Sequence, residues 1–237
     1  MTGGITAAAA LAHVKATRLA HFTPAKNLPH ILADASILSS KDLADNAPEY
    51  FSPTDRERFD RHPDKVCCSF EYPNAYYLRR AQAKPEYRNY PDWVCLLLDI
   101  TLAERPGALF SPCNAAKNSG AYLRPGGDAI LACYAPQVRE WERRPGHMPG
   151  APTDLQTEAL IPGPIDLSYL RGIVVPSSEA AQNEYGRLLT LGVNPDGLPW
   201  LVAPTFFNPD ELARRLRFGG TVAEAVWLPP VREGGPA

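Results

Sequence analysis

The sequence predicts an α+β protein, and three observations support this class. Short strand-like and helix-like segments are mixed along the chain, with few helices among them. Trp93–Ile100 is an almost unbroken apolar run, as expected of a central strand that is buried on both faces. The 25 prolines are scattered over the 237 residues, which indicates many loops and no single flexible linker. We therefore expect one domain over residues 1–237, with residues 230–237 as a disordered tail.

The expected strands are short apolar runs that end at polar or turn-forming residues. They are Arg18–Phe22, Val66–Phe70, Trp93–Ile100, Ala129–Cys133, Glu158–Ile161, Gly172–Val175 and Leu198–Val202. The expected helices are Leu28–Ala35, Asn74–Lys84, Ser178–Leu191 and Pro209–Phe218. In the third of these helices, a capping serine is followed by early acidic residues, which is typical of a helix N-terminus.

The composition is that of a globular protein without a membrane segment. No stretch approaches the roughly 20 consecutive apolar residues that a membrane helix requires. The alanine-rich start lacks the basic segment and the cleavage context of a signal peptide. The five cysteines are odd in number and form no Cys-x-x-Cys pair, so we expect small buried side chains in a reducing cytoplasm rather than disulfides or zinc ligands.

The charge distribution argues against a protein that coats DNA. The formal net charge is −2, whereas a general nucleic-acid binder is usually basic. Two local basic clusters remain, and each is either a solvated face or a set of contacts to a strand backbone. One cluster is Arg79, Arg80, Lys84 and Arg88, and the other is Arg139, Arg143 and Arg144.

Two short motifs, far apart in the sequence, contain the residue types that an NAD-cleaving enzyme needs. His21–Thr23 (HFT) ends an apolar strand and leads through Asn27 into a short helix, and Gln156–Glu158 (QTE) precedes another apolar strand. The early His and Thr can hold the nicotinamide ribose and amide. The late carboxylate can stabilise the positive charge that develops on the ribose as nicotinamide leaves. No phosphate-cradling glycine loop occurs in the chain, so we do not expect a nucleotide to bind as in dehydrogenases.

These motifs resemble the DarT family of bacterial toxins, which transfer ADP-ribose from NAD onto bases of single-stranded DNA. The resemblance covers about residues 18–178 and rests on the stretches LAHFTPAKNLPHILADASILS, RERFD, CCSFEYPNAYYL, CNAAKN and LQTEALIPGPIDLSYLRGIVV. It implies an ADP-ribosyltransferase fold, in which split, twisted β-sheets with peripheral helices enclose an NAD cleft. It also implies a cytoplasmic glycosyltransferase that uses NAD as co-substrate, releases nicotinamide and needs no metal. As the toxin of a toxin–antitoxin system, such a protein has single-stranded DNA and an antitoxin with ADP-ribosylglycohydrolase activity as partners.

The resemblance implies catalytic roles for Glu158 and Arg58. A carboxylate near the ribose 2′-hydroxyl stabilises the oxocarbenium-like ribose and can take the proton of the acceptor. A guanidinium keeps its charge and pairs with a pyrophosphate through two hydrogen bonds. Arg58 matches the family pattern in the stretch RFD, while Arg56 and Arg61 remain alternatives for the same contact.

The resemblance places the other NAD contacts on two segments. The first follows the HFT motif, where Asn27 is alternatively a helix cap. The second is the strand-to-helix corner SFEYPNAYYL, where an aromatic ring stacks on nicotinamide and Asn74 shapes the pocket. The alternative for this corner is an ordinary turn with Tyr77 in the core. The set expected to bind NAD is His21, Thr23, Asn27, Arg58, Ser69, Asn74 and Tyr77, with Asn114 of CNAAKN as a further candidate.

We expect the acceptor to contact the segment that precedes Glu158. In ADP-ribosyltransferases this loop recognises the acceptor, and here it is the Pro- and Gly-rich stretch Arg139–Asp154, which is typical of a mobile loop. Gln156 shares a face with Glu158 if the segment is extended, because side chains two residues apart on a strand point the same way. The residues expected to bind the acceptor are Gln156, Arg143 and Arg144.

Alternatives to a DNA-modifying toxin remain open from the sequence. They are a related transferase that modifies RNA or protein, an NAD glycohydrolase, and an inactive relative that only binds nucleic acid. The presence of both His21 and Glu158 argues against the inactive relative. Base chemistry requires an unpaired or extruded base, which favours single strands. The RFD and YPN features resemble the guanine-modifying branch of the family more than the thymine-modifying one.

Overall fold

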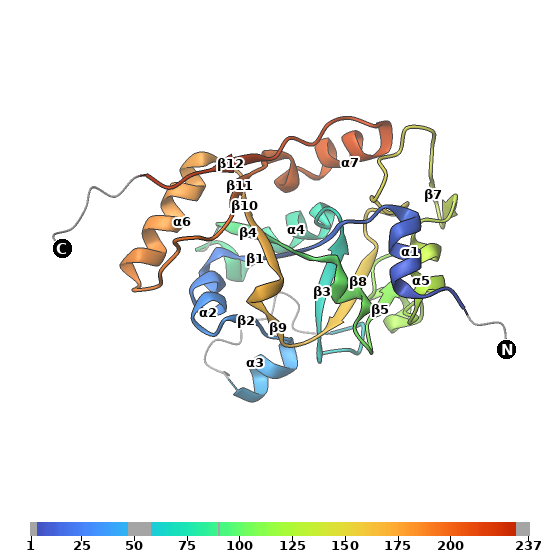
Figure 1. Cartoon of the computed structure of the whole chain (residues 1–237), viewed down its shortest axis with the longest axis horizontal. Coiled ribbons are helices and arrows are strands. Elements are labelled where there is room, and N and C mark those ends of the chain that lie inside the picture. Colours follow the sequence, from blue (N-terminus) through green and yellow to red (C-terminus); the bar gives the residue numbers. More distant parts are fainter. Residues whose placement is uncertain (1–3, 47–57, 90, 231–237) are drawn as a thin grey trace.

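An eight-stranded sheet forms the centre of the structure, a computed structural model that describes residues 4–46, 58–89 and 91–230. Its strand order is β12-β11-β10-β4-β1-β3-β8-β5 (Figure 1), and the neighbours are antiparallel except β10 and β11. The strands are β1 Arg18–Pro24, β2 Ser36–Ile37, β3 Lys65–Phe70, β4 Trp93–Asp99, β5 Leu109–Ser111, β6 Gln137–Val138, β7 Trp141–Glu142, β8 Glu158–Pro162, β9 Ile165–Asp166, β10 Leu170–Val175, β11 Trp200–Val202 and β12 Ala225–Trp227. The helices are α1 Ala7–Val14, α2 Leu28–Ala33, α3 Ser40–Asn46, α4 Ala75–Gln82, α5 Gly127–Cys133, α6 Ser178–Thr190 and α7 Pro209–Phe218.

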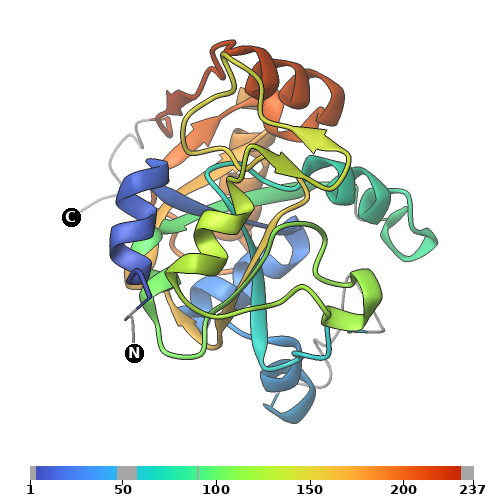
Figure 2. The same cartoon turned by 90° about the vertical axis from the view of Figure 1, so that its right-hand side faces the viewer.

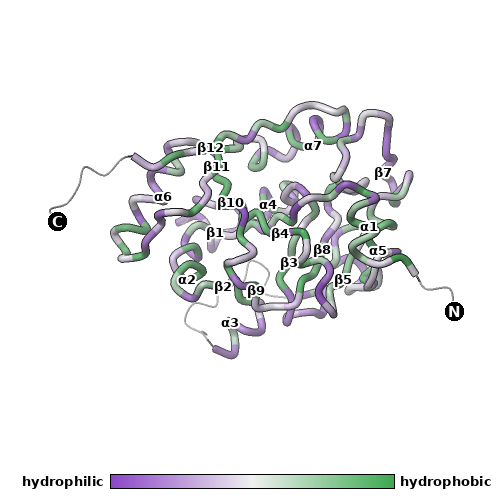
Figure 3. Tube along the Cα trace, viewed as in Figure 1, coloured by the Kyte–Doolittle hydropathy of each residue, from purple (hydrophilic) through white to green (hydrophobic). Residues whose placement is uncertain are grey.

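The two faces of the sheet are covered by different helices. Along β4, Val94, Leu96 and Leu98 pack into the core formed with α1, α5 and α6. The intervening Cys95 and Leu97 face the other way, toward the side on which α4 and α7 contact each other. Figure 2 shows α1 and α5 side by side, and Figure 3 shows how hydrophobic residues concentrate along β3 and β4. A central strand buried on both faces is therefore confirmed.

The sheet is split between β1 and β3. β1 pairs with β4 along its whole length. It pairs with β3 at only two positions, Leu19 with Phe70 and Ala20 with Ser69. β3 then continues with β8, and β8 with β5, as a separate half. The two halves diverge from His21 onward, which confirms the expected split sheets and leaves an opening between them.

Most of the expected strands and helices are confirmed with small shifts at their ends, but Ala129–Cys133 is not a strand. It belongs to α5, which packs against α1. Ala129, Ile130 and Cys133 are buried while Ala132 is exposed, which is the spacing of a helix face rather than the alternation of a strand. A short apolar run fits both periods, so its sequence did not distinguish them.

The N-terminal region forms a helix that the sequence did not predict. Thr6 caps α1, because its Oγ1 accepts a hydrogen bond from the backbone N of Ala9 at 3.2 Å. The helix buries Ala10, Leu11 and Val14. At the other end of the chain, residues 231–237 of the expected tail lie outside the described residues. Among the helices that the structure describes, none has the length and apolar character needed to cross a membrane.

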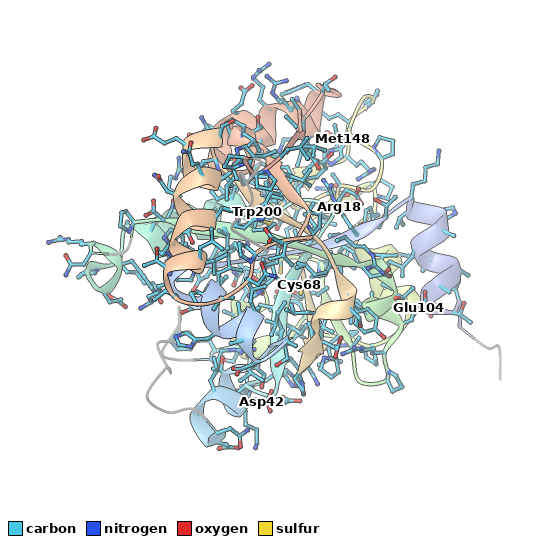
Figure 4. All side chains as sticks on the ribbon, turned by 60° about the vertical axis from the view of Figure 1, so that its left-hand side comes forward. Arg18, Asp42, Cys68, Glu104, Met148 and Trp200 are labelled. Carbon is cyan, nitrogen blue, oxygen red and sulfur yellow. The ribbon has the colours of Figure 1, made fainter. Side chains whose placement is uncertain are left out.

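The five cysteines are free thiols. Four of them, Cys68, Cys95, Cys113 and Cys133, are buried as small side chains, as expected. Cys68 lies near the middle of the molecule (Figure 4). Burial raises the pKa of Cys95 to about 12, so this thiol stays protonated. Cys67 differs from the other four, because it is half-buried and lies at the opening between β1 and β3.

Candidate active site

A cavity of about 520 Å³ opens where β1 and β3 diverge. This volume lies within the range of roughly 300–1,000 Å³ that is usual for small-molecule sites. Its wall combines β1, β3 and α4 with the segment after β2, the loop after β5 and the start of β8. Several predicted site residues come together there: His21, Arg58, Ser69, Asn74, Tyr77 and Glu158. Their roles in NAD binding and catalysis remain predictions, but their proximity is a property of the fold.

The strand register explains why Ser69 and Glu158 meet. β1 pairs Ala20 with Ser69, and β3 pairs Cys68 with Ala159. When the second register is continued by one residue, Glu158 comes beside Ser69. Opposite residues on neighbouring strands point to the same face. Ala20, Ser69 and Glu158 therefore form a row on the cavity side of the sheet.

His21 bridges the gap between β1 and β3 with its ring. Its Nδ1 lies 2.8 Å from the main-chain oxygen of Cys67. Because a carbonyl only accepts, Nδ1 carries the proton and Nε2 is left as an acceptor. Burial lowers the pKa of His21, and the hydrogen bond to Cys67 opposes this only in part. The imidazole is therefore neutral at ordinary pH and can accept a hydrogen bond from a ribose hydroxyl.

Glu158 is held from the side by the loop that follows β5. Asn114 Nδ2 donates to its Oε1 at 3.2 Å, and the backbone N of Ala115 donates to its Oε2 at 3.1 Å. Asn114 is fixed in turn, because its Oδ1 accepts a hydrogen bond from the backbone N of Ala116 at 3.1 Å. Donors of this kind favour a charged carboxylate. Asn114 thus orients Glu158, a contact that the CNAAKN stretch did not reveal.

The guanidinium of Arg58 is already bound within the protein. Its Nε lies 3.2 and 3.1 Å from the two carboxylate oxygens of Asp60, and Nη1 donates to Ser40 Oγ at 2.9 Å. Nη1 and Nη2 also donate to the main-chain oxygens of Lys65 at 3.1 Å and His62 at 2.5 Å. Arg58 therefore ties its own segment to α3 and β3. A phosphate could bind Arg58 only by displacing one of these bonds, so direct contact with NAD remains a prediction.

The electrostatic surroundings of Arg58 nevertheless connect it to the site. Burial lowers the pKa of Arg58, but the neighbouring Cys67, Asp60 and Glu158 together raise it above its ordinary value. Its fixed positive charge therefore acts on Glu158 through space. Of the two alternatives, Arg61 is exposed and does not line the cavity, and Arg56 lies outside the described residues.

The corner between β3 and α4 is built around Asn74. Asn74 Oδ1 accepts a hydrogen bond from the backbone N of Tyr77 at 3.0 Å, and its own backbone N donates to Ser69 Oγ at 3.2 Å. The N–H of Tyr77 needs an acceptor, so the side-chain amide of Asn74 must turn its oxygen toward it. The amide nitrogen Nδ2 of Asn74 is then left as a donor. Nδ2 is buried and has no hydrogen-bond partner among the described residues. An unpaired buried donor costs about 1–3 kcal/mol, which a ligand oxygen in the cavity would offset.

Two residues predicted to bind NAD, Thr23 and Asn27, do not line the cavity. Asn27 Nδ2 donates to Thr23 Oγ1 at 3.0 Å, and Thr23 is buried. On β1, Thr23 alternates onto the same face as Leu19 and His21, but only His21 of these three lines the cavity. Asn27 precedes α2 without capping it through its side chain. The pair holds the turn after β1, and its contact with NAD remains a prediction.

Gln156 does not have the extended backbone on which its predicted alignment with Glu158 depended. Asp154 Oδ1 accepts a hydrogen bond from the backbone N of Gln156 at 2.9 Å, and the backbone N of Thr157 donates to Asp154 O at 3.0 Å. These bonds form a turn, and β8 begins only at Glu158. Gln156 is half-buried and does not line the cavity.

The stretch Arg139–Asp154 is not a free loop, contrary to the expectation from its composition. It leads through the hairpin of β6 and β7, and Arg143 then donates to the main-chain oxygens of Ala151 at 2.8 Å and Met148 at 3.2 Å. Arg143 thus ties the loop together, whereas its neighbour Arg144 is exposed. Neither arginine lines the cavity, so their contact with an acceptor remains a prediction.

Some cavity residues were missed by reasoning from the sequence. Cys67 and Lys65 precede Ser69 on β3 by two and four positions and line the same wall. Strand alternation from Ser69 would have identified both. Phe59, which is exposed, also lines the cavity, as does Arg80, which the sequence had placed in a basic cluster. No sequence signal marked Phe59, since a single aromatic residue in a charged stretch shows neither the alternation of a strand nor the spacing of a helix face.

A family model matches the greater part of the chain. The model described as ssDNA thymidine ADP-ribosyltransferase, DarT, matches residues 20–207. The match extends beyond residue 178, where the motifs seen in the sequence end, and it includes α6 and β11. No curated protein gives a significant match.

Solved structures of DarT proteins share the fold. Thermus sp. 2.9 DarT in complex with ADP-ribosylated ssDNA is 16% identical with a TM-score of 0.57, over 81% of this chain and 97% of that one. Its complex with carba-NAD+ gives 13% identity and a TM-score of 0.54, over 81% and 98% of the two chains. Thermosipho africanus DarTG in complex with ADP-ribose is 19% identical with a TM-score of 0.57 over 81% of this chain. The chain spans about half of that DarTG chain, 51%.

Proposed function

Because the chain belongs to the DarT family, we propose that it transfers ADP-ribose from NAD to a base in single-stranded DNA and releases nicotinamide. The observation that best supports this proposal is the meeting of His21 and Glu158 at one cavity. A neutral hydrogen-bond acceptor and a fixed carboxylate are suited to holding a ribose and stabilising positive charge on it.

In the proposed reaction, Glu158 stabilises the charge that develops on the ribose. The bond between ribose C1′ and nicotinamide breaks, and its electron pair leaves with nicotinamide. The carboxylate, oriented by Asn114 and Ala115, accepts a hydrogen bond from the 2′-hydroxyl and stabilises the cationic sugar. A nitrogen of the base then bonds to C1′, and its proton passes to the carboxylate or to water.

The other cavity residues position NAD in this proposal. His21 Nε2 accepts a hydrogen bond from a ribose hydroxyl, since its Nδ1–H is held by Cys67. The unpaired Nδ2 of Asn74 donates to the carboxamide oxygen of nicotinamide. Arg58 acts mainly by fixing the adjoining wall of the cavity and by its charge near Glu158.

The base that is modified distinguishes two versions of the proposal. The description of the family model names thymidine. The RFD and YPN features of the sequence instead resemble the guanine-modifying branch. Single-stranded oligonucleotides that contain only thymine or only guanine as a reactive base separate the two versions, because each predicts labelling of one and not the other.

We further propose that the protein acts in the cytoplasm as the toxin of a toxin–antitoxin pair. Modified bases would block replication, and an antitoxin with ADP-ribosylglycohydrolase activity would reverse the damage. Expression of the protein alone should therefore arrest bacterial growth, and such a partner should relieve the arrest. Normal growth with abundant, NAD-cleaving protein would contradict the toxin role without affecting the proposed chemistry.

An acceptor panel tests the proposed reaction directly. Labelled NAD is incubated with single-stranded DNA, duplex DNA, RNA or protein, together with the wild type or Glu158→Gln. With the wild type, we expect label on single-stranded DNA and little on duplex DNA, because extrusion of a base from a duplex costs a few kcal/mol. With Glu158→Gln, we expect little label on any acceptor. Loss of the carboxylate should lower the rate by roughly 10²–10³. Label on RNA or protein instead of DNA would show that the acceptor in the proposal is wrong. NAD cleavage without transfer would show that the protein is an NAD glycohydrolase with no macromolecular acceptor.

A further inference from the structure

One side of α4 presents its polar residues to the cavity. Tyr77 and Arg80 line the wall three residues apart on one face of α4, and Lys84, two residues beyond the end of this helix, lines it as well. Leu78 and Ala81 are buried on the side that packs against the protein. The cavity therefore has a basic outer edge, which we call the α4 rim and define as Arg80 and Lys84.

The neighbouring arginine on the same helix has a different environment. Arg79 Nη1 donates to Asp210 Oδ2 of α7 at 2.9 Å and does not line the cavity. Arg88, the last residue of this basic cluster, is exposed and also lies outside the cavity wall. None of the three arginines of the second basic cluster lines the cavity. Arg143 of this cluster is bonded within its own loop. Only the α4 rim therefore brings basic side chains of these two clusters to the cavity.

The rim is placed at the mouth of the cavity rather than deep inside it. Arg80 is exposed, whereas Lys65, another basic residue of the wall, is buried and bonded to Asp64. Lys84 Nζ lies 5.8 Å from the centre of the Tyr77 ring, which favours an ammonium position next to the cavity.

A basic edge at the mouth of the cavity, with Arg80 exposed and Lys84 half-buried, fits a polymer better than it fits NAD. A strand must leave the cavity on both sides of the base that reacts, so its phosphates pass over the rim. NAD is a small molecule that a cavity of this size can enclose. The net charge of −2 means that attraction to a strand has to come from local groups of this kind.

We propose that the α4 rim is the phosphate-binding edge for the acceptor strand, with Arg80 and Lys84 contacting backbone phosphates of single-stranded DNA next to the target base. This inference rests on the proposed function and goes beyond it, because it assigns the acceptor to α4 rather than to the loop Arg139–Asp154. It also separates acceptor affinity, set at the rim, from NAD affinity, set deeper in the cavity.

The test compares Arg80→Ala and Lys84→Ala with the matched control Arg79→Ala, which removes the same charge one residue away. Binding of a fluorescent single-stranded oligonucleotide is measured between roughly 50 and 200 mM salt, and binding of NAD is measured by calorimetry for the same variants. Each rim substitution should weaken DNA binding about fivefold to tenfold at the lower salt and reduce the salt slope by about 0.7. NAD affinity should be unchanged, and the control should bind DNA like the wild type.

The possible outcomes distinguish failure of the inference about the rim from failure of the proposed function. Weaker NAD binding with unchanged DNA binding would assign the rim to the pyrophosphate of NAD and overturn the inference. Equal losses in the rim variants and in Arg79→Ala would reduce the effect to net charge and also overturn it. If the wild type cleaves NAD but neither binds nor modifies DNA, both the proposed function and the inference are wrong. If the wild type modifies DNA and the rim substitutions leave DNA binding unchanged, only the inference is wrong.

Discussion

Replacing Asn114 by Asp should abolish the proposed transferase activity through its effect on Glu158. Asn114 is anchored by its Oδ1, so the new carboxylate oxygen would occupy the position of Nδ2, 3.2 Å from Glu158 Oε1. A donor is thereby exchanged for a second negative charge. Two like charges about 4 Å apart repel by roughly 4 kcal/mol at an effective dielectric constant of 20. The pair will therefore share one proton near neutral pH, as closely spaced carboxylates do.

The assay is the pH dependence of ADP-ribose transfer to single-stranded DNA, with NAD and DNA saturating. At pH 7 the Asn114→Asp variant should lose roughly 10²–10³ in rate, because the single negative charge of the pair is shared with the new carboxylate at position 114 and is no longer held on Glu158 beside the ribose. Activity should rise toward alkaline pH as the shared proton leaves. Asn114→Ala removes one charge-assisted hydrogen bond without adding charge, and about 1.5–3 kcal/mol corresponds to a smaller loss of roughly 10- to 100-fold.

The matched control is Asn118→Asp, which adds the same charge to the same loop. Asn118 bonds to Tyr122 and does not line the cavity. This variant should keep a normal rate and a normal pH profile. If Asn114→Asp were as active as the control at pH 7, the contact between Asn114 and Glu158 would have no part in catalysis.

Three further predictions follow from the contacts at the site. Arg58→Ala should lower the free energy of unfolding by about 3 kcal/mol, since it leaves the buried carboxylate of Asp60 without its guanidinium partner, and it should weaken NAD binding. Arg61→Ala should leave both quantities unchanged. Equal effects of the two substitutions in calorimetry would contradict the special role of Arg58. Asn74→Ala removes the cap of α4, worth about 1 kcal/mol, but also the unpaired buried Nδ2, so Tm should not fall by the full amount of roughly 2–4 °C that the cap alone implies, whereas NAD binding should weaken. Asn74→Ser should keep the cap and weaken NAD binding to the same extent, and unchanged NAD binding in both variants would contradict the role of Nδ2. Because the pKa of His21 is lowered in the folded state, the neutral ring contributes stability above the unfolded value of about 6.5, and this contribution decreases as the pH falls below it. His21→Gln should flatten that part of the stability curve, and an unchanged slope would contradict the buried neutral ring.

The sequence predicted the parts of the site that depend on strands and motifs. The apolar run from Trp93 and the position of Glu158 at the start of a strand were visible because burial and alternation are local properties. α5 was mistaken for a strand because a short apolar run has no resolvable period. Arg58 was expected to contact NAD and Arg143 to contact the acceptor, because composition does not show that a guanidinium is bonded to main-chain oxygens several residues away. The turn at Asp154 likewise removed the extended backbone assumed for Gln156.

The split between β1 and β3 places two strand edges inside the sheet, facing one another. Such edges are usually found only at the margins of a sheet, where their unpaired main-chain groups face solvent. Here they are joined at Ala20 and Ser69 and spanned by the imidazole of His21. The opening is therefore a consequence of backbone pairing rather than of any set of side chains. Sequence drift can change most of the residues around such a seam without closing it, which accounts for a fold shared with relatives at 13–19% identity.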